Sequence, residues 1–158
     1  MTLRRALVAG FGVALSLGTA HAADKVTLQL KWVTQAQFAG YYVAKDKGFY
    51  KAEGLDVTIK PGGPDVAPEQ VLAGGGADVT VDWMPSALAS REKGVPLVNI
   101  SQTFKKSGLE LTCRADTGIK KPEDLKGRTL GVWFYGNEYP FLNWMGKLHF
   151  RPTARPEA

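Results

Sequence analysis

KWVTQAQFAGYYVAKDKGFY, residues 31–50, is the stretch that decides the fold. A short alternating strand ends near Trp32, a polar turn covers residues 33–37, and apolar residues recur at near-helical spacing from Phe38 until Gly48. A strand that gives way to a helix aims unpaired backbone N–H groups into the crevice at the carboxyl end of a sheet, where open α/β folds bind small molecules. We therefore expect a ligand-binding junction here, with Trp32 at its mouth.

The rest of the chain repeats this alternation of strands and helices. Alternating patterns and short apolar runs predict strands at residues 25–32, 55–60, 79–81, 97–100, 109–114 and 129–133. Helical spacing, bounded by glycines and prolines, predicts helices at residues 38–48, 65–73, 85–93 and 139–148, and one helical turn at 122–125. Asp65 is expected to cap the second helix. This order is typical of an α/β fold with a mainly parallel sheet covered on both faces.

The two ends of the chain are expected to lie outside the folded part. Residues 1–22 have the charged start, the apolar run and the small-residue site of a secretory signal peptide, with cleavage after Ala22. The apolar run is shorter than the roughly 20 residues that span a bilayer; a retained membrane anchor is the alternative. Residues 151–158 lack apolar periodicity and are expected to form a disordered tail.

The charge pattern argues against a nucleic-acid partner. The 158-residue chain carries a formal charge of +5, which falls to +3 when residues 1–22, with Arg4 and Arg5, are removed. The remaining lysines are scattered among acidic residues, as in residues 45–47 and 120–126. Such interspersion indicates a solvated mixed surface and not a basic stripe.

The small numbers of cysteine and histidine residues limit which disulfides, metal sites and catalytic groups the chain can form. Cys113 is the only cysteine, so no intrachain disulfide can form, and we expect it buried and inert inside a strand. Once residues 1–22 are removed, His149 is the only histidine. A zinc site and a Ser/His/Asp triad both need more than this. We therefore predict no catalytic residue, no metal ligand and no cofactor.

Aromatic residues follow three of the predicted strands. They are Trp32, Trp83, Trp133, Phe134 and Tyr135. The carboxyl ends of parallel strands meet at one edge of a sheet, so we expect these rings to face one crevice. Stacking on such rings contributes roughly 0.5 to 1.5 kcal/mol per pair beyond burial, which favours a flat heteroaromatic ligand. The alternative for Trp133 is a place in the core.

Polar side chains in the same turns could fix the orientation of a ligand. They are Gln35, Gln37, Asp82, Asn137 and Glu138. The hydroxyl groups of Tyr41 and Tyr42 could also reach the pocket. The alternatives are that Glu138 only stabilises the first turn of its helix, and that Phe38 and the two tyrosines pack in the core.

The turns also indicate which ligands to expect. No Arg or Lys lies at residues 33–37 or 82–86, where an anion such as nitrate or a sulfonate would need one. A carboxylate at Asp82 or Glu138 suits an amino-substituted ring. The sequence therefore favours a pyrimidine-like heterocycle.

The order of short motifs resembles a known family. Trp32, the run GYYVA at residues 40–44, KGFY at 47–50 and EGLDV at 53–57 resemble the opening of periplasmic substrate-binding proteins of ABC importers. The branch is the one that serves nitrate, sulfonates, taurine and thiamine-pyrimidine precursors. GAD at residues 76–78, KGVP at 93–96, and KP with DLKG at 121–127 continue the resemblance, which covers about residues 25 to 150.

The resemblance implies a type II periplasmic binding-protein fold that closes two lobes around a ligand. By this comparison residues 23–102 form the N-terminal part of lobe I, and residues 103–150 form the beginning of lobe II. It also implies a periplasmic location and partnership with an ABC permease and ATPase, with the membrane reached only through the permease. Family members run to roughly twice this length, so we expect a C-terminally truncated member that is poorly soluble and binds weakly.

The same branch contains the thiamine pyrimidine synthases, which build their product from histidine and pyridoxal phosphate with an active-site histidine and an iron-binding cysteine motif. Aligned by Trp32 and Gly40, the position of that histidine is Phe38 here. Pyridoxal phosphate and iron are therefore implied only under this alternative. A third possibility is an inert fragment.

Overall fold

A computed structural model describes residues 22–134 and 136–151. Within them β1 (Asp24–Gln29), β2 (Leu55–Lys60) and β3 (Val79–Thr80) form a parallel sheet in the order β2-β1-β3. β1 pairs with β2 along its whole length, from Asp24 opposite Leu55 to Gln29 opposite Lys60, and with β3 only at Leu28 and Gln29. The predicted α/β class with a parallel sheet is confirmed.

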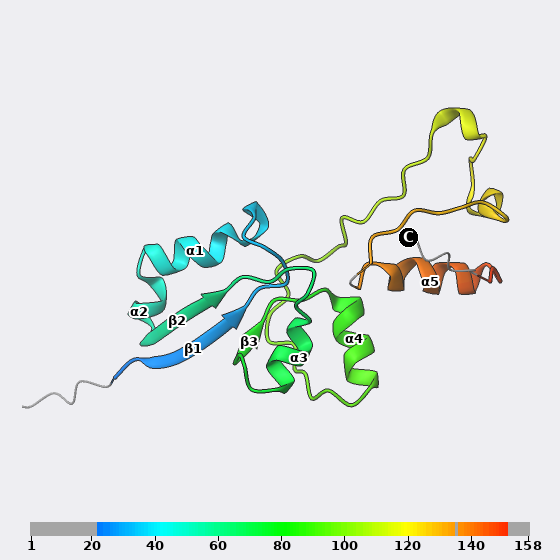
Figure 1. The fold of residues 1–158 in the computed structure, drawn as a ribbon. Helices are drawn as coiled ribbons and strands as arrows, with labels where there is room; N and C mark the ends of the chain where they lie inside the picture. The colour runs from blue at the N-terminus through cyan, green and yellow to red at the C-terminus, as the bar shows by residue number, and fades with distance from the viewer. Residues whose placement is uncertain (1–21, 135, 152–158) are drawn as a thin grey trace, which may run out of the picture.

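Helices lie on both sides of this sheet (Figure 1). On one side the 3₁₀ turn η1 (Ala36–Phe38) leads into α1 (Ala39–Asp46), and α1 and α2 (Phe49–Ala52) pack against β2. On the other side α3 (Pro68–Ala73) packs against β1 and β3. Further along the chain α4 (Met84–Glu92) contacts α5 (Glu138–Lys147), while η2 (Ala115–Thr117) and η3 (Pro122–Leu125) are single turns.

The core lies between the sheet and α1. Its four buried side chains are Leu28, Leu30, Phe38 and Val57. Tyr41, Tyr42 and Tyr50 pack around this cluster. Leu30 is completely buried. The alternation of apolar residues along β1 turns one face of that strand toward this cluster.

Strand-like bonding continues past the end of β1. The Leu30 N–H donates to Lys60 O over 2.9 Å, and the Gly62 N–H donates to Trp32 O over 2.9 Å. These bonds hold Lys31 and Trp32 at the carboxyl edge of the sheet. The junction predicted at this point is therefore tied by backbone hydrogen bonds to the end of β2 and the turn that follows it.

The predicted helices form close to the expected residues, but the chain also forms η1 and α2, which were not predicted, and α3 begins later than expected. Gly48 ends α1 in the left-handed region at φ 75°, which a glycine adopts without steric cost. Asp65, however, does not cap α3: that helix begins at Pro68 after Ala67, and no side chain caps it. Proline suits the first helical position because its φ is fixed and it needs no N–H partner. It sets the helix start three residues beyond Asp65.

The strands predicted at residues 97–100, 109–114 and 129–133 are wrong. The backbone there is irregular, and Figure 1 shows a long connection without strands between α4 and α5, interrupted only by short turns. A strand needs a neighbouring strand to bond with, and in the described residues these segments pair with none. Several of their apolar side chains are accordingly exposed, Val98 by 80% and Ile100 by 75%. Cys113, expected inside a strand, is exposed as well.

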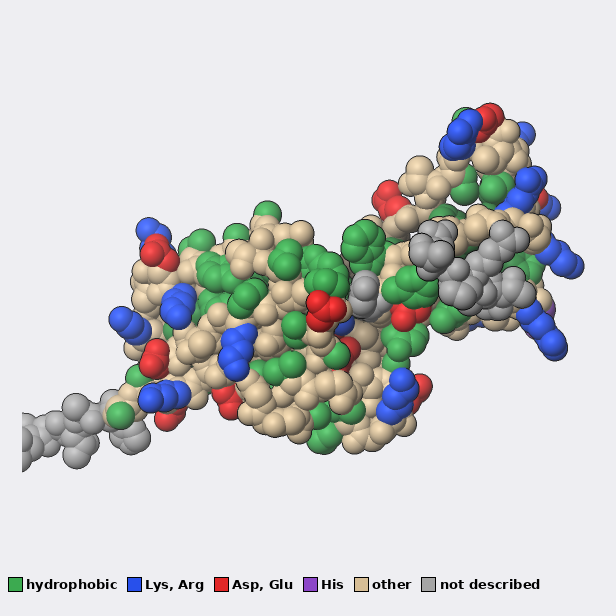
Figure 2. All heavy atoms as spheres, viewed as in Figure 1, with side chains coloured by type: hydrophobic (Ala, Val, Ile, Leu, Met, Phe, Trp, Pro, Cys, Tyr) green, Lys and Arg blue, Asp and Glu red, His purple; other side chains and the backbone are tan. Residues whose placement is uncertain are grey.

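The surface is a mixture of charges, as predicted. Figure 2 shows Lys and Arg side chains beside Asp and Glu side chains over the visible face. In the described parts of the chain, no helix is long and apolar enough to cross a bilayer. Residues 1–21 and 152–158 lie outside the described residues, so the signal peptide and the disordered tail stay predictions.

Candidate ligand-binding site

Two neighbouring cavities open near the carboxyl end of β1. The one that we call the aromatic cavity measures about 320 Å³ and is lined by Lys31, Trp32, Gln35, Gln37, Trp83, Trp133 and Asn137. The one that we call the polar cavity measures about 300 Å³ and is lined by Lys31, Pro64, Asp65, Val66, Ala67, Glu69, Gln70, Ser86, Ser90, Gly136 and Tyr139. Lys31 borders both cavities.

Three tryptophans from distant segments form the aromatic cavity. Trp32 follows β1, Trp83 immediately precedes α4, and Trp133 comes from the connection before α5. The rings of Trp32 and Trp133 meet edge to face with centroids 6.2 Å apart. The walls can therefore offer ring faces and edges to a flat ligand, the contact type that aromatic pairs prefer.

Apart from Lys31, the polar side chains that line the aromatic cavity are amides. Gln37 Nε2 donates to Gln35 Oε1 over 2.7 Å, and Asn137 Nδ2 donates to Phe134 O over 3.0 Å. Amides both donate and accept hydrogen bonds, as the edge of a heterocycle requires. The aromatic cavity thus combines apolar walls with a few polar groups, which is the usual composition of a small-molecule site.

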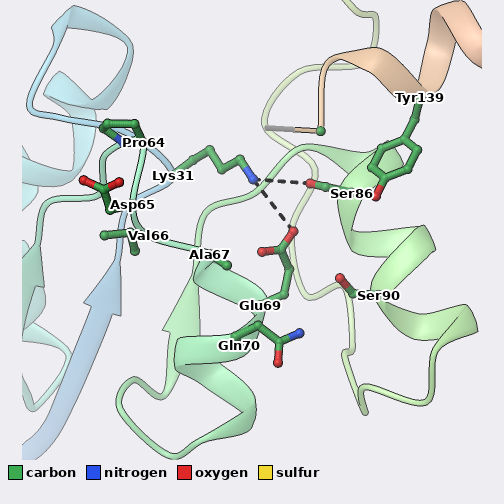
Figure 3. Close-up of a pocket in the computed structure, with 11 residues that line it drawn as sticks. Lys31, Pro64, Asp65, Val66, Ala67, Glu69, Gln70, Ser86, Ser90 and Tyr139 are labelled. Carbon is green, nitrogen blue, oxygen red and sulfur yellow. Dashed lines mark hydrogen bonds and ion pairs between the residues drawn. The ribbon is translucent and has the colours of Figure 1, made fainter. Parts of the chain in front are cut away.

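A buried charge cluster separates the two cavities. Figure 3 shows Lys31 reaching toward Glu69 at the start of α3 and Ser86 in α4. Lys31 Nζ lies 2.8 Å from Asp82 Oδ1 and 3.7 Å from Glu69 Oε1, and each of the three side chains is only 7% exposed. Two carboxyl groups therefore share one ammonium in a place with little water.

The geometry of Asp82 explains its ionisation. Its Oδ1 accepts hydrogen bonds from the Trp83 N–H at 2.8 Å and from Ser86 Oγ at 2.9 Å. Its Oδ2 is buried and meets no donor among the described residues. Burial first, and then hydrogen bonding with Glu69, raises the pKa of Asp82 from 3.8 to about 6, although Lys31 opposes the rise.

The pKa of Glu69 shifts in the opposite direction. Burial alone would raise the pKa of Glu69, but hydrogen bonds with Asp82 and with its own backbone, together with the charge of Lys31, bring it below the usual 4.5. As the pH rises, the pair of Glu69 and Asp82 therefore loses its first proton below pH 4.5 and its second near pH 6. A proton on either carboxyl would also supply the hydrogen bond that Asp82 Oδ2 lacks.

The structure brings together half of the residues predicted to bind the ligand. Trp32, Gln37, Trp83, Trp133 and Asn137 line the aromatic cavity, as does Gln35. Asp82 lies beside it in the charge cluster. Tyr135 is outside the described residues.

The other predicted residues lie elsewhere. Tyr41 and Tyr42 pack against the core, and at the surface the Tyr42 hydroxyl shares a hydrogen bond with Thr34 Oγ1 at 2.9 Å. Phe134 is 62% exposed and borders neither cavity. Glu138 accepts the Gly136 N–H at 2.8 Å, which closes the turn before α5, and it borders neither cavity.

Sequence reasoning did not identify Lys31, Glu69 and Ser86 as parts of the site. One signal was available in the sequence: Gln29 and Lys31 alternate with Leu28 and Leu30 in a strand expected to be covered on both faces. In the structure all four side chains are buried. A lysine on the second face of a strand that helices cover on both sides must find acidic partners. Among the described residues no cluster of His, Cys, Asp and Glu is arranged to hold a metal ion.

Comparison with known proteins relates the chain to binding proteins and to synthases. A family model described as NMT1/THI5 like matches residues 35–149. The formylaminopyrimidine-binding protein of Halalkalibacterium halodurans is 28% identical over 111 residues, which cover 70% of this chain and 34% of that protein. The riboflavin-binding protein RibY of Chloroflexus aurantiacus is 27% identical over 112 residues, 69% of this chain and 32% of that protein.

A third relative is named as an enzyme. The 4-amino-5-hydroxymethyl-2-methylpyrimidine phosphate synthase of Aspergillus parasiticus is 28% identical over 110 residues, 68% of this chain and 32% of that protein. The chain spans about a third of the length of these three relatives.

Proposed function

This chain belongs to the NMT1/THI5-like family, and on that premise we propose that it is the solute-binding component of an ABC importer for a small heteroaromatic ligand related to thiamine-pyrimidine precursors. Its site of action is then the periplasm, which residues 1–22 allow it to reach. Its partners are the permease and ATPase of the importer.

The aromatic cavity is the observation that supports this proposal. Three indole rings and three amide side chains surround about 320 Å³, within the range of small-molecule sites. A single pyrimidine ring fits between such walls, with the amides of Gln35, Gln37 and Asn137 available to its ring nitrogens and substituents. Two relatives are named for binding formylaminopyrimidine and riboflavin, both of which contain flat heteroaromatic rings.

The origin of the cavity walls agrees with a two-lobed protein. Trp32 and Trp83 come from residues 23–102, which we assign to lobe I, whereas Trp133 and Asn137 come from residues 103–150, which we assign to lobe II. A ligand held between the rings would be gripped from both lobes. Closure of the lobes around it is part of the proposal.

The alternative is a pyrimidine synthase, which the name of the Aspergillus relative favours. Phe38, at the position implied for the catalytic histidine, is 2% exposed and packs with Leu28 and Leu30 in the core. With one exposed cysteine and one histidine beyond residue 22, the residues present do not fit the iron motif of that chemistry. We therefore place the binding function first.

Calorimetric titration of the full chain tests the proposal. We expect one-to-one binding of formylaminopyrimidine or 4-amino-5-hydroxymethyl-2-methylpyrimidine, with quenching of tryptophan fluorescence. Taurine, which lacks an aromatic ring, serves as the control ligand and should not bind. Binding of taurine alone would reject the heteroaromatic assignment, and formation of the pyrimidine from added pyridoxal phosphate would favour the synthase.

A further inference from the structure

The position of Lys31 bears on which ligand charge the site can accept. Its side chain borders both cavities and is the only cation among the described residues that line them. A lysine ammonium beside a ligand cavity is a common binding group for phosphate and other anions. By position alone, Lys31 would make the site suitable for an anionic ligand.

The acidic side chains around Lys31 prevent it from binding an anionic ligand. Lys31 Nζ contacts the carboxyl groups of Asp82 and Glu69 at 2.8 and 3.7 Å, so the fully ionised cluster carries one excess negative charge. With so little water to screen it, that charge acts strongly on a ligand next to it. The ammonium is directed toward its carboxylate partners, as Figure 3 shows for Glu69.

Other elements hold this arrangement in place. The Trp83 N–H and Ser86 Oγ fix the Asp82 carboxyl at the start of α4. Gly136 lies so close that a Cβ on it would come within 2.8 Å of Ser86 Cβ and 3.9 Å of Lys31 Nζ. The remaining titratable groups nearby are Asp65 and Tyr139, which border the polar cavity, and Glu138, which accepts the Gly136 N–H. None of them supplies a second cation.

We propose that Glu69 and Asp82 determine ligand specificity: by neutralising Lys31 and adding one negative charge, they make the site reject anions in favour of uncharged ligands that carry the same ring. This inference rests on the proposed function and names the charge class of its ligand. Glu69 and Asp82 act here through Lys31, so they are positioning residues.

The test compares two ligands that differ only in charge. The full chain is titrated at pH 7.5 with 4-amino-5-hydroxymethyl-2-methylpyrimidine and with its phosphate ester. We expect the wild type to prefer the neutral compound at least tenfold. Glu69→Gln and Asp82→Asn should each reduce this preference at least threefold, and the double variant should reduce it further because Lys31 then has no carboxylate partner.

Two controls separate the charge effect from damage to the fold. Asp65→Asn removes a carboxylate that borders the polar cavity but forms no ion pair with Lys31 in the described structure, so the preference should not change. Adding Lys31→Met to Asp82→Asn should abolish the gained affinity for the ester. If circular dichroism shows that Asp82→Asn does not fold, the same comparison is made with Glu69→Gln and with the double variant Glu69→Gln/Lys31→Met. The affinity for the ester gained by Glu69→Gln should then be lost in the double variant.

Sulfate provides a measurement that needs no heterocycle. It should bind the Glu69→Gln variant at least threefold more tightly than the wild type, and the wild type more tightly at pH 5 than at pH 7.5, since the carboxyl pair regains a proton between these values. An unchanged sulfate affinity in both comparisons overturns the inference. A wild type that binds neither pyrimidine overturns the proposed function, while the sulfate result still decides this inference.

Discussion

The indole rings of Trp32 and Trp133 meet edge to face, with centroids 6.2 Å apart and ring planes at 75°. Trp32 is anchored at the edge of the sheet, whereas Trp133 belongs to the irregular connection that leads to α5. This contact therefore joins the early and late parts of the chain at the aromatic cavity. Both rings line that cavity, so its shape depends on the contact.

Replacing Trp133 should weaken ligand binding. Trp133→Ala removes one wall of the aromatic cavity, and the lost ring contact corresponds to roughly 0.5 to 1.5 kcal/mol, or about a two- to thirteenfold rise in Kd. Stability should change little, because the Trp133 side chain is 64% exposed. Calorimetry with the neutral pyrimidine measures the first effect and urea unfolding the second.

Phe134→Ala is the matched control for this prediction. Phe134 is the next residue along the chain and is exposed to a similar degree, yet it borders neither cavity. Its loss should leave Kd unchanged. Equal losses of affinity in the two variants would mean that the aromatic cavity is not where the ligand binds.

The core of the sheet should be sensitive to truncation. Leu30→Ala empties space around a side chain that is fully buried among Leu28, Phe38 and Val57, and such changes cost about 2 to 5 kcal/mol. Leu88→Ala makes the same chemical change at a position in α4 that is 53% exposed and should cost far less. Urea denaturation followed by circular dichroism compares them, and similar midpoints would argue against this core.

The sequence predicted the first half of the fold better than the second. From Asp24 to Glu92, period-two and helical patterns coincide with boundary residues such as Gly48 and Pro68, and each predicted strand and helix formed near its expected position, although α2 was not predicted and α3 began later. From Leu97 onward the same kind of apolar run predicted strands that are absent. Periodicity reports that a segment could pack against a sheet, but it does not report whether a partner strand is there.

The site shows a similar limit. Tryptophans after strands are visible in the sequence, and those at 32, 83 and 133 do line one cavity. The ion cluster depends on residues 31, 69 and 82, which only the parallel pairing and the packing of α3 bring together. No short-range pattern links these positions, so the neutralisation of Lys31 could not be read from spacing.

Stability should fall as the pH rises from about 4.5 to about 6. The pKa of Asp82 is 3.8 in its reference state and about 6 in the fold, so the folded state binds more protons across this window and loses its advantage as they dissociate. The size of the effect is on the order of 1 to 3 kcal/mol. Glu69 has the opposite sign, but its window lies below 4.5.

Urea midpoints at half-unit steps between pH 4.5 and 7 measure this effect. Asp82→Asn cannot titrate at that position, so its stability should be nearly constant over the window. A wild type whose stability rises with pH over the same range would show that Asp82 is ionised there in the fold.

Gly62 should be essential for holding Lys31 in place. A Cβ at position 62 would lie 2.7 Å from the Lys31 carbonyl carbon and 2.8 Å from its oxygen, and closer still to Leu30 O, all of them backbone atoms that cannot move aside cheaply. Gly62→Ala should therefore cost about 1 to 3 kcal/mol by overpacking and should displace the edge of the sheet that positions Lys31 and Trp32. Gly63→Ala is the matched control, because its Cβ would meet only Val33 Cγ1 at an ordinary 3.9 Å. Urea unfolding and pyrimidine titration of both variants test this, and a Gly62→Ala protein as stable and as active in binding as Gly63→Ala would contradict the close approach of residue 62 to β1.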